Sequence, residues 1–385
     1  MQGSMGRARR PQGETLPAQA GRRIVSLILF PQAVSFCSRP DTLLANGDDI
    51  VPCRAGGNCY VTGVPDTDTD SRKPLRRAVC GACRASNWIP GDLPPFDPVA
   101  CTKCGHPVIA ATRIGQFELR EVVASGGMGT VYRAFDVNLE RLVAVKLMKR
   151  EMLDDKEVLE SFYREARAIA ALNHTNIIHI YEFDEYENRP FQVMELADNG
   201  SLDSRMEKEG PLPELFVLDV AIAVTSALAS ALKRGLLHRD IKPGNILFNA
   251  ENEPKVVDFG LARKTGEQEY EAHIWGTPYY VAPEKIKREG EDFRSDMYSL
   301  GGTLYHALTG HVPFEAPTVE EVVAAHVHTP LTPPNLVRPD VTQLTSDVLA
   351  STMAKNPDER YASYDDLRMS LEAARSHLLV QMYAQ

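Results

Sequence analysis

A glycine-rich segment between two predicted strands is the first part of the chain whose residue types could do chemistry. It reads Ala124-Ser125-Gly126-Gly127-Met128-Gly129-Thr130-Val131. Glycines in such a turn let backbone N–H groups approach phosphate oxygens, because no Cβ stands in the way. A glycine-rich hairpin is more often only a turn, so this segment alone is weak support for a phosphate site.

A lysine at the end of an apolar strand is the second candidate. Lys146 closes the segment Val143-Ala144-Val145-Lys146, 17 residues after Gly129. A buried or half-buried lysine needs a partner charge, and Glu165, on a predicted amphipathic helix, is the natural candidate. Taken singly, Lys146 would be an edge residue that reaches for solvent, and Glu165 would belong to a solvated helix face.

Three motifs in the second half of the chain decide between these interpretations. His238-Arg239-Asp240-Ile241-Lys242-Pro243-Gly244-Asn245 is followed by Asp258-Phe259-Gly260 and then by Ala282-Pro283-Glu284. With this ordered set, the sequence resembles the eukaryotic-like (Hanks-type) serine/threonine protein kinases, and their bacterial branch in particular. The resemblance runs from about Phe117 to about Leu371.

The resemblance implies transfer of the ATP γ-phosphate to serine and threonine hydroxyls of protein substrates, autophosphorylation included. Asp240 is then the catalytic base beside the substrate hydroxyl, and Lys242 steadies the γ-phosphate. Lys146, paired with Glu165, would hold the α- and β-phosphates. Phosphoryl transfer depends on positioning and on neutralising phosphate charge, which this set of residues can supply.

The resemblance also assigns the magnesium and nucleotide contacts. Asn245 and Asp258 look like the two ligands of Mg²⁺ (or Mn²⁺), since hard oxygen donors suit these ions. The glycine turn would cover the phosphates. The remaining residues implied in ATP binding are Val131, Ala144 and Leu247 around adenine, Met194 as gatekeeper, and Glu195 and Ala197 in the hinge.

Three further matches to the family are architectural or lie near the substrate. Glu284 would pair with Arg360, and Asp296 would anchor the catalytic loop from its helix. Thr277, in Gly276-Thr277-Pro278, would lie beside the substrate hydroxyl.

Two positions depart from the family pattern. The first glycine of the usual G-x-G-x-x-G is Ala124 here, which we interpret as a tolerated substitution. The threonines that related kinases phosphorylate, about six and eight residues before Thr277, are Glu271 and Glu269. One hypothesis is that either carboxylate replaces the phosphate that Arg239 normally binds. The alternative is a solvated run of charge on a mobile loop.

The cysteines indicate a second, smaller module. Cys80-x-x-Cys83 and Cys101-x-x-Cys104 are separated by 17 residues, which is typical of a zinc ribbon with a structural, four-cysteine Zn²⁺ site. The alternative is two incidental pairs, free or in a redox disulfide. Cys53 and Cys59 are compatible with a degenerate second site or with free thiols, and four cysteines make His106 unnecessary as a ligand. No role is assigned to Cys37.

The charge of the ribbon bears on its partner. Residues 71–113 carry a formal +5, which four zinc-bound thiolates lower to about +3. We favour a regulatory protein partner or autoregulation over nucleic acid, with Trp88 as the exposed aromatic contact. The whole chain has a formal net charge of −10, which also argues against a general nucleic-acid binder.

The elements that must position these residues follow from periodicity and turn signals. We predict an α+β, bilobal kinase fold (residues 117–378) with a β-rich N-lobe (117–196) and an α-rich C-lobe (197–378). The ribbon would span residues 78–108, after an irregular region at 1–75. Predicted strands are 117–123, 130–135, 141–148, 177–183 and 191–196; predicted helices are 156–172, 214–233, 295–308, 319–326, 345–355 and 364–378.

We expect a cytoplasmic protein without a membrane span. No apolar run is expected to approach the roughly 18–20 residues that a span needs. The longest candidate, Ile24–Phe30 after Arg22 and Arg23, admits a weak signal peptide, although a tail or short strand fits better. Two other functions remain open: an ATP-binding pseudokinase, and a ribbon-based binding protein that its kinase domain regulates.

The role of Asp240 can be tested by substitution. Asp240→Asn removes the carboxylate that accepts the hydroxyl proton, so turnover is expected to fall by roughly 10²–10⁴. Phosphate incorporation into a protein substrate measures this. Wild-type turnover by the purified variant would contradict the assignment.

Overall fold

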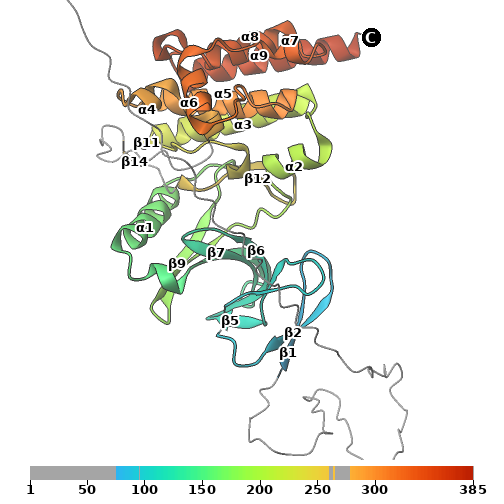
Figure 1. The fold of residues 1–385 in the computed structure, drawn as a ribbon, viewed down its shortest axis with the longest axis vertical. Helices are drawn as coiled ribbons and strands as arrows, with labels where there is room; N and C mark the ends of the chain where they lie inside the picture. The colour runs from blue at the N-terminus through green and yellow to red at the C-terminus, as the bar shows by residue number, and fades with distance from the viewer. Residues whose placement is uncertain (1–74, 95, 260–262, 265–277, 385) are drawn as a thin grey trace, which may run out of the picture. The chain divides into compact units, whose positions relative to one another are not determined.

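The computed structural model describes residues 75–94, 96–259, 263–264 and 278–384, all within the unit Asp68–Gln385. An antiparallel sheet is followed by a mainly helical part (Figure 1), which confirms the predicted two-lobed α+β fold. The predicted irregular region before residue 75, with Ile24–Phe30, lies outside the described residues, as do Cys37, Cys53 and Cys59.

Six strands form the N-lobe sheet in the order β5-β6-β7-β8-β10-β9, with every neighbouring pair antiparallel. Side chains alternate between the two faces of such a sheet, so β7 buries every second residue. The strands are β5 (Thr112–Ile114), β6 (Phe117–Ser125), β7 (Gly129–Asp136), β8 (Arg141–Met148), β9 (Ile180–Tyr186) and β10 (Arg189–Met194).

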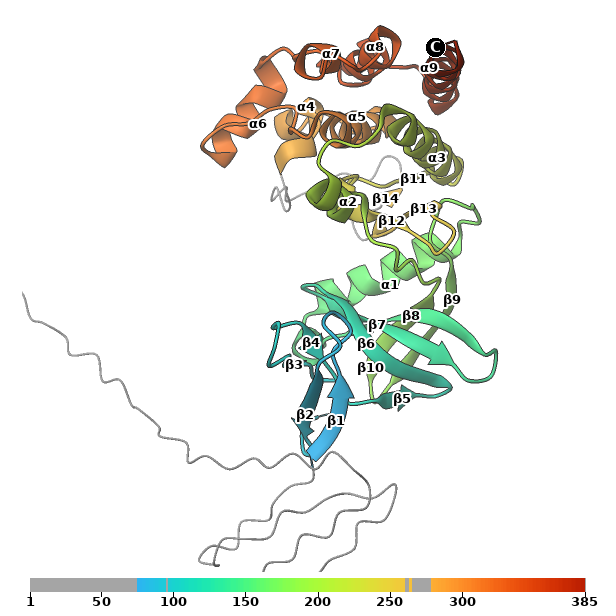
Figure 2. The same cartoon turned by 90° about the vertical axis from the view of Figure 1, so that its right-hand side faces the viewer.

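Helix α1 (Lys156–Ala170) runs between the sheet and the helical part in the view of Figure 2. The Asp155 side chain caps it by accepting hydrogen bonds from two backbone N–H groups of its first turn. Phe162, Ala166 and Ile169 are buried on the face toward the protein, whereas Ala170 at the end of the helix is exposed. Glu165 is buried instead, at 3% exposure.

The C-lobe packs its helices around one large apolar cluster, to which α3, α5, α8 and α9 all contribute. Two short antiparallel strand pairs, β11–β14 and β12–β13, form separate two-stranded sheets outside the six-stranded sheet. The helices are α2 (Leu202–Glu209), α3 (Glu214–Leu232), α4 (Pro283–Lys287), α5 (Phe293–Thr309), α6 (Val319–His328), α7 (Pro334–Val337), α8 (Gln343–Thr352) and α9 (Tyr364–Tyr383). The short strands are β11 (Leu236–Leu237), β12 (Ile246–Phe248), β13 (Pro254–Val256) and β14 (Arg263–Lys264), and the 3₁₀ turns are η1 (Arg150–Met152), η2 (Pro243–Asn245), η4 (Pro278–Tyr280) and η5 (Pro357–Glu359).

One strand begins later than predicted. Residues 177–183 were expected as a strand, but β9 begins at Ile180. Ile177 forms a parallel bridge to Val256 of β13 instead, and the N–H of Ile178 donates to the Val256 carbonyl. These residues therefore pair with the C-lobe, which leaves them unavailable to the sheet.

Helix α3 corrects the expectation that no apolar run approaches the length of a membrane span. It has 19 residues, and an 18-residue window within it has a mean hydropathy of 2.1, enough to cross a bilayer by length and composition alone. Half of this stretch is buried inside the protein, and α3 packs against α5 and α9. Helices hydrophobic on most sides are also found in the cores of globular proteins.

A buried ion pair joins α4 to the segment before α9. Arg360 donates to both carboxylate oxygens of Glu284, at 2.7 and 2.8 Å, and the two side chains are 0% and 4% exposed. Ser295 donates to the same carboxylate at 2.6 Å. Burial raises the pKa of Glu284, but the hydrogen bonds and charge of Arg360 outweigh it and hold this pKa below its ordinary value. The pairing expected between Glu284 and Arg360 is therefore present.

This pair sets an expectation for stability. Arg360→Met leaves a buried carboxylate without its partner, so the free energy of unfolding should fall by about 3–5 kcal/mol in urea titrations. Arg360→Lys keeps the charge but not the two-point contact and should recover only part of the loss. Arg368→Met breaks exposed pairs to Asp365 and Glu372 and should cost about 0–1 kcal/mol. Equal losses in Arg360→Met and Arg368→Met would contradict the argument.

Candidate active site and cysteine cluster

The loop that carries Asp240 is held by a carboxylate from α5. Asp296, buried at 3% exposure, accepts hydrogen bonds from the backbone N–H groups of His238 at 2.8 Å and of Arg239 at 2.7 Å. The buried His238 ring bonds the Val257 carbonyl through Nε2 and the Asp240 N–H through Nδ1. Arg239 has a φ of 69°, a left-handed conformation that is unfavourable for this residue type. The hydrogen bonds to Asp296 and His238 hold the loop in this conformation.

Three side chains of this loop converge. Lys242 Nζ lies 2.7 Å from Asp240 Oδ2, and Asn245 Nδ2 donates to the same oxygen at 3.0 Å and to the Asp240 carbonyl at 2.8 Å. Both side-chain hydrogen bonds of Asn245 use its nitrogen, so its Oδ1 is the atom that can face a cation. The partly exposed carboxylate of Asp240, the ammonium of Lys242 and the amide oxygen of Asn245 thus lie close together in one short loop.

A second charged group comes from three elements distant in sequence. Lys146 on β8 pairs with Glu165 on α1 at 2.7 Å and with Asp258 at 3.3 Å. Burial lowers the pKa of Lys146, but the two carboxylates outweigh it and raise this pKa above its ordinary value, so the ammonium stays charged. The side chains of Lys146 and Glu165 are 14% and 4% exposed, whereas that of Asp258 is 55% exposed. Asp258 therefore has room for a cation.

Phe259 holds the segment that carries Asp258. Its ring is buried at 1% exposure and lies 4.5 Å from the His238 ring. Asp258 itself has a φ of 61°, so its carboxylate leaves the chain in a direction that an extended backbone would not allow. Gly260, the next residue, lies outside the described part of the chain.

The residues expected around adenine come from both lobes. Ala144 on β8 pairs with Met194 on β10, and Val131 on β7 pairs with Lys146. Leu247 lies on β12 and forms a bridge to Ser201.

The structure shows which backbone group of the hinge residue Glu195 is available to adenine. The Glu195 N–H donates to the His179 carbonyl, and its side chain pairs with Lys255 at 2.7 Å. Glu195 can therefore offer adenine its carbonyl oxygen.

The glycine turn is shorter than its sequence indicated. Ala124 pairs with Val131 inside the β6–β7 ladder, and the turn closes with Gly126 N–H donating to the Gly129 carbonyl. Ala124 is an ordinary strand residue that needs no positive φ, which explains how it fits where the family pattern has glycine. A Cβ at Gly129 would lie 2.8 Å from the Leu147 carbonyl oxygen, so this glycine is required by the neighbouring strand.

Arg239 has a partner that sequence reasoning missed. Its Nε lies 3.1 Å from a carboxylate oxygen of Glu291, which also faces Lys285 at 4.0 Å. Glu291 lies among several acidic residues between α4 and α5, and nothing in its spacing distinguishes it from them. Glu269, Glu271 and Thr277 lie outside the described residues.

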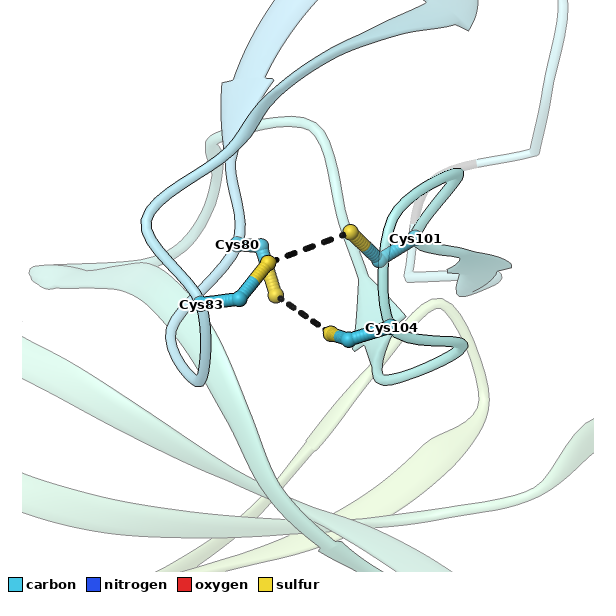
Figure 3. A group of neighbouring side chains, drawn as sticks. All are labelled: Cys80, Cys83, Cys101 and Cys104. Carbon is cyan, nitrogen blue, oxygen red and sulfur yellow. Dashed lines mark hydrogen bonds between the residues drawn. The ribbon is translucent and has the colours of Figure 1, made fainter.

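The four ribbon cysteines meet in one cluster (Figure 3). Their sulfur atoms all lie within 4.8 Å of one another, and the closest approaches, 3.6 Å, join Cys80 to Cys104 and Cys83 to Cys101. A tetrahedral site with Zn–S distances of about 2.3 Å places its sulfurs about 3.8 Å apart. The contacts run between the two CxxC pairs, as such a site requires.

The two CxxC turns have the same backbone pattern. In the first, Cys80 N–H donates to the Ala85 carbonyl and Arg84 N–H to the Cys80 carbonyl; in the second, Cys101 and Gly105 make the equivalent bonds. Arg84 and Gly105 have φ values of 59° and 76°. Arg84 takes the position in the first turn that is equivalent to that of Gly105 in the second.

The thiols favour a bound cation. The Lys103 N–H lowers the pKa of Cys101 to about 6, which favours its thiolate form. The His106 N–H lowers the pKa of Cys104, but the sulfurs of Cys83 and Cys80 outweigh it and raise this pKa to about 12. A divalent cation among the sulfurs would stabilise all four as thiolates.

Strands β1 (Leu75–Val79) and β2 (Ser86–Pro90), with β3 (Val99–Ala100) and β4 (Pro107–Val108), frame the cluster as two antiparallel pairs. Trp88 on β2 is 64% exposed, as expected for a contact residue. His106 is half-buried, and its Nε2 lies 3.2 Å from the Val122 carbonyl of β6.

Comparison with known proteins places this chain in a family. A model of the protein kinase domain matches residues 117–371. The serine/threonine-protein kinase PknL of Mycobacterium tuberculosis is 35% identical over 274 residues, 71% of this chain and 69% of the relative. PknE of Mycobacterium bovis and PknB of Mycobacterium leprae are each 35% identical over 68% and 66% of this chain. The chain spans 47% and 42% of those two relatives.

The cysteine cluster predicts a metal content. The purified chain should hold one zinc atom, and Cys101→Ser should abolish it and lower the melting temperature, because a structural zinc contributes to folding. Atomic emission and thermal melting measure the two effects. Cys37→Ser is the matched control and should keep the zinc. Full zinc content in Cys101→Ser would contradict a four-cysteine site.

Proposed function

Because the chain belongs to the protein kinase family, we propose that it transfers the ATP γ-phosphate to serine and threonine hydroxyls of proteins, itself included. The observation that carries this proposal is the convergence of Asp240, Lys242 and Asn245 on one side, and of Lys146, Glu165 and Asp258 on the other. The names of the relatives, all serine/threonine-protein kinases, support the same substrate class.

Each side chain has a role that its surroundings permit. Asp240 is partly exposed and accepts the proton of the substrate hydroxyl, while Lys242, held by the same carboxylate, neutralises charge on the phosphate. Lys146 stays charged beside Glu165 and binds the inner phosphates. Asn245 Oδ1 and the exposed carboxylate of Asp258 are hard donors that fit Mg²⁺ or Mn²⁺. Such an ion, when bound, draws charge from the phosphate oxygens.

A pseudokinase is the competing function. It would bind nucleotide without transfer, as expected when a charged group or a metal ligand of the site is lost. Lys146, Asp240, Asn245 and Asp258 are all present and positioned, so we favour an active enzyme. We further propose a cytoplasmic location, where ATP and protein substrates are found.

The ribbon is proposed as a structural zinc module that binds a regulatory protein partner. Four cysteines fill a tetrahedral site, which leaves no open position for catalysis. Exposed Trp88 and Leu75, on one face of the β1–β2 pair with Arg77, offer a mixed apolar and basic surface. Such a surface fits a protein partner, whereas the charge of the chain disfavours nucleic acid.

We also propose that the kinase is active without phosphorylation of the loop between Asp258 and Glu284. Glu291 already places a carboxylate beside Arg239, so this guanidinium has a partner in the described structure. Glu269 or Glu271 would supply further negative charge from the loop. The alternative, in which these glutamates are only a solvated run, predicts no effect of replacing them.

The activity itself is tested with the full chain, ATP, Mg²⁺ and a generic basic protein. Phosphate is expected on serine and threonine, and Lys146→Met should abolish the transfer. Mass spectrometry of the product identifies the modified residues. Nucleotide binding without any transfer would instead support the pseudokinase.

Loop control is tested by phosphatase treatment. The treated enzyme is expected to keep most of its activity, because carboxylates do not depend on phosphorylation. Glu269→Ala/Glu271→Ala should lower activity roughly 10-fold or more, as expected for a lost charge-assisted hydrogen bond of about 1.5–3 kcal/mol. A large loss on phosphatase treatment, or full activity of the double variant, would rule the idea out.

A further inference from the structure

The cysteine module shares its hydrophobic core with the N-lobe sheet. Phe96 of the module is 4% exposed and belongs to the same buried cluster as Leu119 and Tyr132 of the sheet. Its carbonyl accepts a hydrogen bond from the Tyr132 hydroxyl at 2.7 Å. Its ring meets the Tyr186 ring edge-on at 5.7 Å, and the Arg189 guanidinium lies 5.5 Å from it. These contacts hold the module in a defined position on the sheet.

A second contact joins the module to β6, the strand that leads into the glycine turn. His106 Nε2, from the second CxxC turn, lies 3.2 Å from the Val122 carbonyl. Gly81, inside the first turn, packs so closely on the Glu121 carboxylate that an added Cβ would collide with it. The pairing of β6 with β7 shifts register on both sides of these two β6 residues. Both CxxC turns therefore contact the sheet where its ladder is irregular.

From Glu121, ion pairs continue to the hinge. Glu121 Oε1 lies 3.0 Å from Arg133 Nη1 on β7, and Arg133 Nη2 lies 3.3 Å from Asp198 Oδ2. Asp198 directly follows Ala197, whose backbone is proposed to meet adenine. The three side chains are 24%, 32% and 27% exposed, so solvent screens these pairs only in part. The network thus runs without a gap from the first CxxC turn to the nucleotide site.

We propose that Glu121 is a positioning residue that links the metal-bound state of the cysteine module to nucleotide affinity. The inference rests on the proposed zinc site and the proposed kinase function. Zinc fixes the first CxxC turn and therefore Gly81, which limits the positions of the Glu121 carboxylate. Glu121 orients Arg133, and Arg133 ties β7 to Asp198. Metal loss frees the turn, so the Glu121 carboxylate is no longer held in place. Strands β6 and β7 then lose their ion-pair connection to Asp198 at the hinge.

The linkage predicts weaker nucleotide binding with little change in the chemical step, because none of these residues touches the reacting atoms. Glu121→Ala should weaken binding of a non-hydrolysable ATP analogue with Mg²⁺ by about two- to thirty-fold, the usual range for coupling through packed networks. KM for ATP should rise by a similar factor while kcat changes less than twofold. Glu121→Gln, which keeps the size of the side chain, should have a smaller effect of the same sign.

The experiment measures analogue affinity by titration calorimetry on the full chain, before and after zinc removal with a chelator. Glu118→Ala is the matched control: it removes a glutamate from the same strand, whose ion-pair partners are Arg113 and Arg120. Zinc removal should weaken binding in the wild type and in Glu118→Ala, but add nothing in Glu121→Ala, since effects within one network do not add.

Three results would overturn the inference. Glu121→Ala and Glu118→Ala could have equal effects; zinc removal could weaken Glu121→Ala as much as the wild type; or the purified wild type could hold no zinc. Because analogue binding is measured directly, absence of phosphate transfer would count against the kinase proposal alone. The comparison of Glu121→Ala with Glu118→Ala would still decide whether Glu121 links the cysteine module to nucleotide affinity.

Discussion

The ion pair between Lys146 and Glu165 is the interaction on which the arrangement of the active site depends. A lysine on β8 and a glutamate on α1 are both nearly removed from water, and loss of the lysine would leave the glutamate as an uncompensated buried charge. The pair can form only when α1 lies against the sheet. The same ammonium reaches Asp258, so one cation determines how the sheet, the helix and the segment after β13 lie together.

A second constraint acts from the C-lobe. Asp296 satisfies two consecutive N–H groups of a loop in which Arg239 has an unfavourable backbone conformation. Buried polar groups need such partners, and here the partner also sets the direction in which Asp240 and Asn245 leave the loop. The two lobes therefore contribute in different ways: the N-lobe positions charge by an ion pair, and the C-lobe by backbone hydrogen bonds.

The sequence was sufficient to predict the fold and most elements, and the structure brings the proposed catalytic residues together, because their motifs are local and each side chain has one chemistry. It was insufficient where a residue depends on a distant partner. Taken singly, Glu165 was expected on a solvated helix face, and its burial is favourable only because its partner Lys146 reaches it from a strand distant in sequence. Glu291 and Phe96 were missed for the same reason. The helix at 214–233 was predicted, but its apolar stretch was not counted as long enough for a membrane span.

The position of Phe96 has a consequence for how such a chain can be assembled in evolution. The family match begins at residue 117, yet the folded core of the N-lobe includes a ring contributed 21 residues earlier. A gene fusion that joined a kinase to a new partner at the family boundary would expose the ring of Tyr186 and the buried guanidinium of Arg189 to water. The module and the sheet are therefore expected to be inherited as one unit, with recombination tolerated only upstream of the first cysteine pair.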